Sequence, residues 1–96
     1  MSLSSAAEAP SFDLARGWTL SPEVALRPEK FGALAYHYGN RRLVFLKSPE
    51  LVALVEALGS FDSVSEALQA NLAPERHASY AQALARLADS EVLVAR

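Results

Sequence analysis

Residues 21–58 read SPEVALRPEKFGALAYHYGNRRLVFLKSPELVALVEAL, and this stretch decides the fold. It holds three short runs with the composition of β-strands, each bounded by turn residues, followed by a helical pattern. The pair Gly39-Asn40 separates the second run (32–38) from the third (42–46). Both residues tolerate positive φ, so two antiparallel strands can meet there in a short loop. The pattern predicts a β-hairpin.

The first of these runs, residues 24–27, is closed by Pro28-Glu29-Lys30. Proline restricts itself and the residue before it to extended or turn geometry. We therefore expect a third strand beside the hairpin.

A helix with marked ends is predicted after the sheet. Ser48 is a good N-cap, and Pro49 suits the first helical position because its missing N–H has no helical partner there. Gly59 is predicted to end the helix in the left-handed conformation. The apolar stripe between these ends consists of Leu51, Leu54, Val55 and Leu58.

Two further helices and a short apolar segment complete the chain. Residues 63–66 match a capping box and predict a short helix to about Asn71. A third helix is expected from Pro74 through about Ala88, and residues 92–94 form either a final strand or an apolar tail on the core. Three antiparallel strands followed by three helices predict an α+β, winged-helix-like domain.

Length and composition are those of one small domain. The 96 residues contain 51% hydrophobic side chains, enough for a single core. Residues 1–11 are small and polar and predict a flexible N-terminal tail, so we expect one domain at 12–96. Phe12, Leu14, Trp18 and Leu20 follow one another at intervals of two or four residues, which suggests an extended arm that buries Trp18.

Several functional classes are disfavoured by composition. The chain has no cysteine, which removes disulfides, thiolate catalysis and cysteine-ligated zinc. No apolar run approaches the roughly 20 residues that span a bilayer, and no signal peptide is recognisable. Net charge is −2, with 9 basic and 11 acidic residues. We expect a soluble, cytoplasmic protein that binds neither membrane nor nucleic acid.

No set of residues predicts an active site. His37 and His77 lie forty residues apart without an acidic partner at i+4, so neither suggests a metal site. The glutamates fall at turns, helix starts and solvent faces, and the four glycines form no phosphate-binding loop. The prediction is a protein that is not an enzyme and holds no cofactor or metal.

A DNA-binding regulator is the main alternative, because winged-helix proteins often read DNA with the third helix. That helix carries only Arg76, His77 and Arg86, and Arg41-Arg42 is the single adjacent basic pair. Useful affinity for DNA takes about 6–10 phosphate contacts, which would need nearly every basic residue on one face.

The third strand is apolar on both faces, since Leu43 and Phe45 alternate with Val44 and Leu46. Such a strand is either sandwiched or open to a partner. If it is a sheet edge beside the third helix, an extended peptide can pair with it. A homodimer formed through the same edge is a third hypothesis, and the oligomeric state stays open.

The sequence also resembles a known family. The segments Leu26-Arg27-Pro28-Glu29, Phe31-Gly32-Ala33-Leu34, Tyr36-His37-Tyr38 and Phe45-Leu46-Lys47-Ser48-Pro49 are similar to those of the peptide chaperones of the mycofactocin system. These are relatives of the PqqD-like domains that recognise precursors of ribosomally made, modified peptides. The resemblance covers about residues 12–94.

This resemblance implies a non-catalytic adaptor. It would bind a short precursor peptide and present it to a radical S-adenosylmethionine (SAM) maturase, which holds the iron–sulfur chemistry. Related domains take the peptide as an added strand between the third strand and the third helix. Here that position implies contacts from Arg42, Leu43, Val44, Phe45, Leu46, Lys47, Arg76, His77, Tyr80, Leu84 and Leu87.

Overall fold

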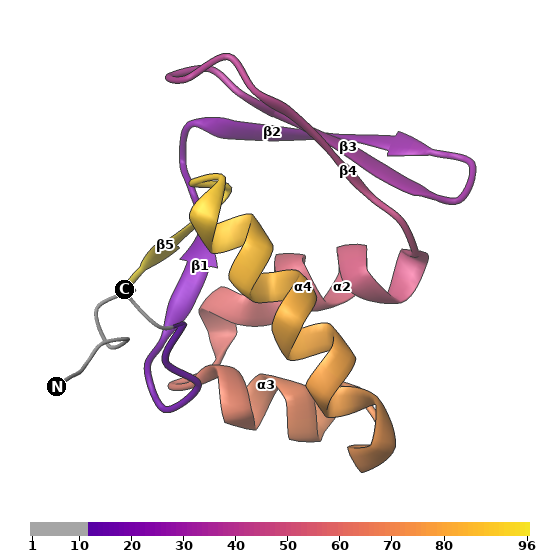
Figure 1. Ribbon diagram of the computed structural model, residues 1–96, viewed down its shortest axis with the longest axis vertical. Helices are drawn as coiled ribbons and strands as arrows, with labels where there is room; N and C mark the ends of the chain where they lie inside the picture. The colour runs from indigo at the N-terminus through magenta and orange to yellow at the C-terminus, as the bar shows by residue number, and fades with distance from the viewer. Residues whose placement is uncertain (1–11) are drawn as a thin grey trace, which may run out of the picture.

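The computed structural model describes residues 12–96, and the tail predicted at 1–11 lies outside the described residues (Figure 1). The described chain has a sheet layer and a helical layer, with a short second sheet at one side. Its strands are β1 (Trp18–Leu20), β2 (Val24–Glu29), β3 (Gly32–His37), β4 (Leu43–Leu46) and β5 (Leu93–Ala95). Its α-helices are α2 (Pro49–Ala57), α3 (Val64–Asn71) and α4 (His77–Asp89), with 3₁₀ turns at Leu58–Ser60 and Pro74–Arg76.

The main sheet has the antiparallel order β2-β3-β4, as the turn pattern predicted. The register pairs Ala33 with Leu46 and Ala35 with Val44. Alternate residues of β3 are buried, so one face of the sheet packs on the core. Helices α2 and α4 lie on that face (Figure 1). The α+β class and the order of sheet before helices are confirmed.

The β3–β4 turn forms where it was expected, but the residue with positive φ is different. Arg41, with φ of 64°, takes the left-handed conformation that Gly39-Asn40 was predicted to supply. The Arg41 N–H donates to the His37 carbonyl, and the His37 N–H donates to the Arg42 carbonyl. This two-against-one pairing is a β-bulge that closes the hairpin.

Helix α2 begins as predicted and ends differently. The Ser48 hydroxyl accepts a hydrogen bond from the Leu51 N–H at 3.1 Å, and Pro49 is the first helical residue. Gly59 does not have positive φ, so the predicted left-handed stop is wrong, and the chain continues into the 3₁₀ turn. Leu58 is buried at the start of this turn, which keeps the chain against the core.

Helix α3 follows its capping signal, whereas α4 begins without a side-chain cap. The Ser63 hydroxyl accepts from the Glu66 N–H at 3.1 Å, and α3 runs to Asn71 as predicted. The third helix opens with the 3₁₀ turn at Pro74–Arg76 before the α-helical hydrogen bonds of α4 begin.

The two ends of the described chain pair with each other. Strand β1 is antiparallel to β5, with Trp18 opposite Ala95 and Leu20 opposite Leu93. This settles the alternative left open by the sequence, because the C-terminal apolar segment is a strand. The ring of Phe12 lies 4.8 Å from that of Trp18, and both side chains are half-buried on the core.

Candidate functional site

An open groove runs beside the edge strand β4 and has a volume of about 290 Å³. One wall is β4, the other is α4, and α2 contributes at the base. The lining residues are Val44, Phe45 and Lys47 from β4 and its end, Leu51 from α2, and Ala83, Arg86 and Leu87 from α4.

Within residues 12–96, β4 pairs with β3 alone and leaves its other side open. The His37 N–H donates to the Arg42 carbonyl, which places the backbone groups of Arg42 toward β3. Backbone direction alternates along an antiparallel strand, so Val44 also pairs inward. The N–H and C=O groups of Leu43 and Phe45 therefore point to the open side, available to an added strand.

The side chains of β4 alternate between the inner and the outer face of the sheet. Leu46 is fully buried in the core, and Val44 is half-buried at the groove. Leu43 is 61% exposed and Phe45 is 46% exposed. Strand β4 is therefore covered on its inner face only. Of the two environments that its apolar composition allowed, sandwiched or open to a partner, the structure has the open one.

The wall formed by α4 has a small residue at its centre. Ala83 stands one helical turn from Tyr80 and from Leu87, so its short side chain leaves space between two larger ones. The Tyr80 hydroxyl accepts from Arg76 Nη2 at 2.9 Å and lies 3.3 Å from the Ser48 hydroxyl. These contacts tie the start of α4 to the N-cap of α2.

The groove carries positive charge without a carboxylate among its lining residues. Lys47 and Arg86 project from opposite walls. Across the chain, residues 24–47 contain five Lys and Arg against one Glu, whereas residues 48–96 contain three Arg against seven Asp and Glu. The charges are thus separated between the sheet layer and the helical layer, a feature that the small net charge hides.

The residues predicted from sequence fall into separate groups in space. Val44, Phe45, Lys47 and Leu87 line the groove. Leu43 lies along the same strand edge, and Arg42 lies in the bulge that precedes it.

The other predicted positions are not groove-lining side chains. Leu46 and Leu84 have no exposed surface and belong to the core below the groove. Arg76 and Tyr80 pair with each other near the N-cap of α2. His77 faces α3, where its Nε2 is 2.9 Å from the Leu72 carbonyl oxygen.

Sequence reasoning missed Leu51, Ala83 and Arg86. Ala83 lies three residues after Tyr80, and Arg86 three residues further, so helical spacing from Tyr80 could have identified both. Leu51 was assigned to the stripe of α2 that faces the core, and it is mostly buried there while its edge reaches the groove.

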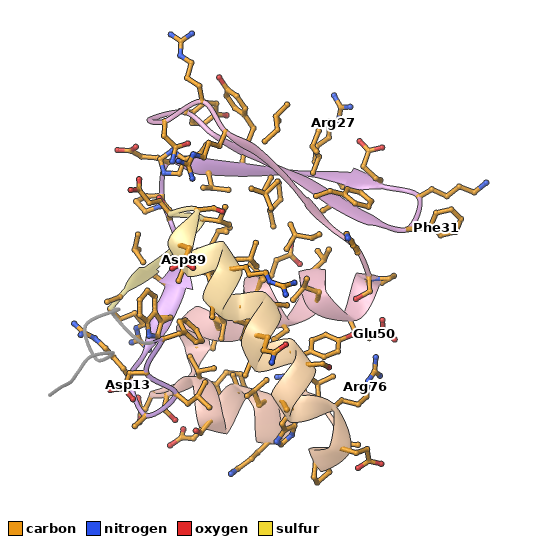
Figure 2. The ribbon with its side chains drawn as sticks, viewed as in Figure 1. Asp13, Arg27, Phe31, Glu50, Arg76 and Asp89 are labelled. Atoms are coloured by element: carbon orange, nitrogen blue, oxygen red, sulfur yellow. The ribbon has the colours of Figure 1, made fainter. Side chains whose placement is uncertain are left out.

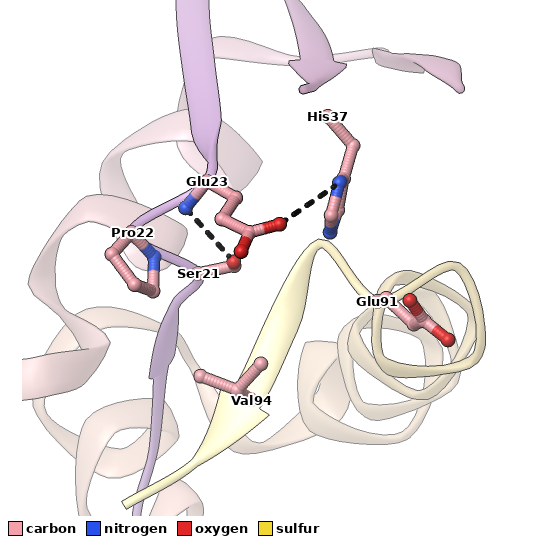
Figure 3. Close-up of a pocket in the computed structure, with 6 residues that line it drawn as sticks. All are labelled: Ser21, Pro22, Glu23, His37, Glu91 and Val94. Carbon is pink, nitrogen blue, oxygen red and sulfur yellow. Dashed lines mark hydrogen bonds and ion pairs between the residues drawn. The ribbon is translucent and has the colours of Figure 1, made fainter. Parts of the chain in front are cut away.

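A second hollow surrounds His37 and is lined by Ser21, Pro22, Glu23, His37, Glu91 and Val94 (Figure 3). His37 Nδ1 accepts hydrogen bonds from the N–H groups of Gly39 and Asn40 at 3.0 and 3.1 Å. These bonds hold the β3–β4 turn and occupy the nitrogen lone pair that a metal would need. No group of three metal-ligating side chains occurs within residues 12–96. We assign this histidine a structural role.

Comparison with known proteins adds a family to this geometry. The model of the Peptide chaperone MftB family matches residues 17–94. The chain is 47% identical to Peptide chaperone MftB of Mycobacterium ulcerans over 90 residues, which cover 93% of this chain and 83% of the relative. It is 43% identical to the protein of the same name in Mycobacterium tuberculosis, with 94% and 84% coverage. The Mycolicibacterium smegmatis protein is also 43% identical, with 92% and 87% coverage.

No solved structure matches this chain. None of the helices within the described residues combines the length and the apolar character that crossing a membrane requires.

Proposed function

Because this chain belongs to the Peptide chaperone MftB family, we propose that it binds a short precursor peptide as an added strand on β4. The family description names a chaperone rather than a catalyst, in agreement with the prediction that the chain is not an enzyme. The observation that carries the proposal is the open edge of β4 beside an apolar groove. Strand addition uses both features at once, since backbone groups bind the edge and alternate side chains enter the groove.

The expected binding energy comes from both parts of the site. Leu43 and Phe45 offer four backbone groups, and four hydrogen bonds at a net 0.5–1.5 kcal/mol each give about 2–6 kcal/mol. Ordering a flexible peptide costs about 2–5 kcal/mol. Micromolar affinity needs about 8 kcal/mol. Backbone pairing is therefore insufficient, and the peptide needs at least two apolar side chains, each worth about 1.5–3 kcal/mol when buried.

The charges of the groove favour a particular class of peptide. Lys47 and Arg86 face the bound strand from both walls, and acidic residues are absent from the lining. A peptide that places carboxylates beside its apolar anchors would gain from both cations. We propose an acidic, partly apolar segment as the ligand.

The partner that modifies the peptide follows from the resemblance of the sequence. We propose that the chain presents the bound peptide to a radical SAM maturase in the cytoplasm, as part of mycofactocin biosynthesis. With no cysteine among its 96 residues, the chain has no thiolate for an iron–sulfur cluster. That chemistry is assigned to the maturase.

Nothing in the fold favours the alternative of DNA binding. Helix α4 carries one arginine, Arg86, and Arg76 at its N-cap is already bound to the Tyr80 hydroxyl. The helical layer around it is predominantly acidic. Phosphate would be repelled rather than attracted there.

Calorimetric titration of the full chain with a synthetic precursor peptide, encoded beside its own gene, tests the proposal. One-to-one binding with micromolar or tighter affinity is expected, and duplex DNA as the control titrant should give no heat of binding. A folded chain that does not bind the peptide would reject the function proposed above.

A further inference from the structure

The face of the β2-β3-β4 sheet turned away from the helices carries a group of exposed apolar side chains. Helices α2 and α4 lie on the opposite face (Figure 1), and Arg27 on the outer face points away from them (Figure 2). Tyr38 is 60% exposed, close to the values for Leu43 and Phe45. We define the outer-face patch as the exposed side chains of Tyr38, Leu43 and Phe45 together with those of Leu34 and Tyr36, which are half-buried on the same face.

These side chains form one continuous surface. The register places Leu34 opposite Phe45 and Tyr36 opposite Leu43. Both are pairs without mutual backbone hydrogen bonds, in which side chains lie closest. The rings of Tyr36 and Tyr38 meet edge to face with centroids 5.3 Å apart. A contiguous exposed apolar surface of this kind marks an interaction site more often than isolated exposed residues do.

The charge around the patch indicates what kind of partner fits. The sheet layer at residues 24–47 carries five basic residues and one acidic residue. A second copy of the chain would bring the same excess of positive charge to the interface, which opposes a dimer through this face. Nucleic acid would need about 6–10 phosphate contacts, more cations than this layer contains. A partner protein with an apolar surface and an acidic rim would match both the apolar patch and the basic residues of the sheet layer.

The outer face is also continuous with the proposed peptide site. Alternate side chains of a strand added to β4 would enter the groove, and those between them would emerge on the outer face beside Leu43 and Phe45. The bound peptide therefore extends the patch by one strand. A protein docked on this face would touch the chaperone and the peptide together.

We propose that the outer-face patch is the docking surface for the enzyme that modifies the bound peptide. This inference rests on the proposed function, because the peptide forms part of the surface. The enzyme contributes an apolar surface rimmed by carboxylates, and it binds the loaded chaperone more tightly than the empty one.

The test uses the full chain, its synthetic precursor peptide and the purified radical SAM maturase from the same gene cluster. The Tyr36→Ser/Tyr38→Ser double variant removes the edge-to-face ring pair of the patch. It changes neither β4 nor a side chain that lines the groove. Phe31→Ser is the matched control, because Phe31 is 67% exposed in the β2–β3 turn and lies outside the patch. Tyr38→Ser alone provides a milder variant should the double variant be unstable.

Peptide affinity and maturase affinity are measured separately, by calorimetry and by sedimentation of the ternary complex. The double variant should bind peptide within about threefold of wild type and lose at least about tenfold in affinity for the maturase, because truncating central interface side chains commonly costs that much. Phe31→Ser should retain both affinities. Wild-type chain that binds no peptide would refute the proposed function itself.

Other outcomes overturn the docking surface while peptide binding stands. One is a loaded wild-type chain that does not bind the maturase, and another is equal maturase affinity of the double variant and wild type. A third is association of the wild-type chain with itself or with anionic phospholipid vesicles that the double variant abolishes, since the patch would then serve a different partner.

Discussion

The carbonyl oxygen of Leu46 occupies the space that a Cβ atom on Gly32 would need. Gly32 opens β3, and Leu46 closes β4 with its side chain in the core. The glycine is therefore required by the close approach of two backbones, and its conformation plays no part because its φ is not positive. This contact sets how closely the end of β4 approaches the start of β3.

Replacing Gly32 with alanine should destabilise the protein by about 3 kcal/mol, because overpacking against fixed backbone forces the strands apart. Urea unfolding followed by circular dichroism measures the change. Phe31→Ala, one residue earlier and exposed, should shift stability by no more than about 0.5 kcal/mol. Equal stabilities of the two variants would show that the strands separate without cost.

Proline substitution distinguishes the two sides of β4. Phe45→Pro should leave the fold intact and abolish peptide binding, since the N–H it removes points to the open side. Phe45→Ala keeps this N–H and removes the same groove-lining side chain, so it should still bind peptide, and more tightly than Phe45→Pro does. Val44→Pro removes an N–H that pairs with β3 and should unfold the sheet. Calorimetry on the folded variants measures binding, and normal peptide affinity of Phe45→Pro would contradict strand addition.

Filling the space at Ala83 should block the groove. Ala83→Leu places a branched side chain between Tyr80 and Leu87, and we expect peptide affinity to fall at least about tenfold, equivalent to 1.4 kcal/mol. The adjacent exposed position supplies the control, because Gln82→Leu adds comparable apolar surface to α4 without lining the groove. Titration with the same peptide compares them, and equal affinities would place the peptide elsewhere.

Charge reversal in the groove should weaken binding of an acidic peptide. Lys47→Glu and Arg86→Glu should each reduce affinity roughly two- to fivefold, since exposed ion pairs contribute about 0.2–1 kcal/mol. The effect should shrink as salt is raised. Arg16→Glu makes the same change in net charge away from the groove and should have little effect. If all three variants lose affinity equally, only the net charge of the protein matters.

Much of the fold could be predicted because its signals are local. The caps at Ser48 and Ser63 each act within three residues, and the hairpin needs only a turn between two apolar runs. The pairing of β1 with β5 has no such signal, since its partners lie at opposite ends of the described chain. The sequence predicted an arm at residues 12–20 and an apolar segment at residues 92–94, but it did not predict that they pair as strands.

The groove-lining residues on β4 were predicted more accurately than those on α4. On β4 and at its end, the predicted residues Val44, Phe45 and Lys47 line the groove, whereas Leu46, which shares a face with Val44, is buried in the core. On α4, the choice between Leu84 and Ala83 depends on how the helix is rotated about its axis, which the surrounding core determines. Leu84 turned out to be core, and Ala83 lines the groove.

The pairing of β1 with β5 brings the two ends of the domain to one place, and neither strand lines the groove. Neighbouring strands lie about 4.8 Å apart, so the start of β1 and the end of β5 are separated by little more than the width of one chain. A domain with this geometry can be inserted into a loop of a larger protein without stretching its host. The same geometry favours circular permutation, with a short linker across β1 and β5 and new ends opened at the exposed β2–β3 turn.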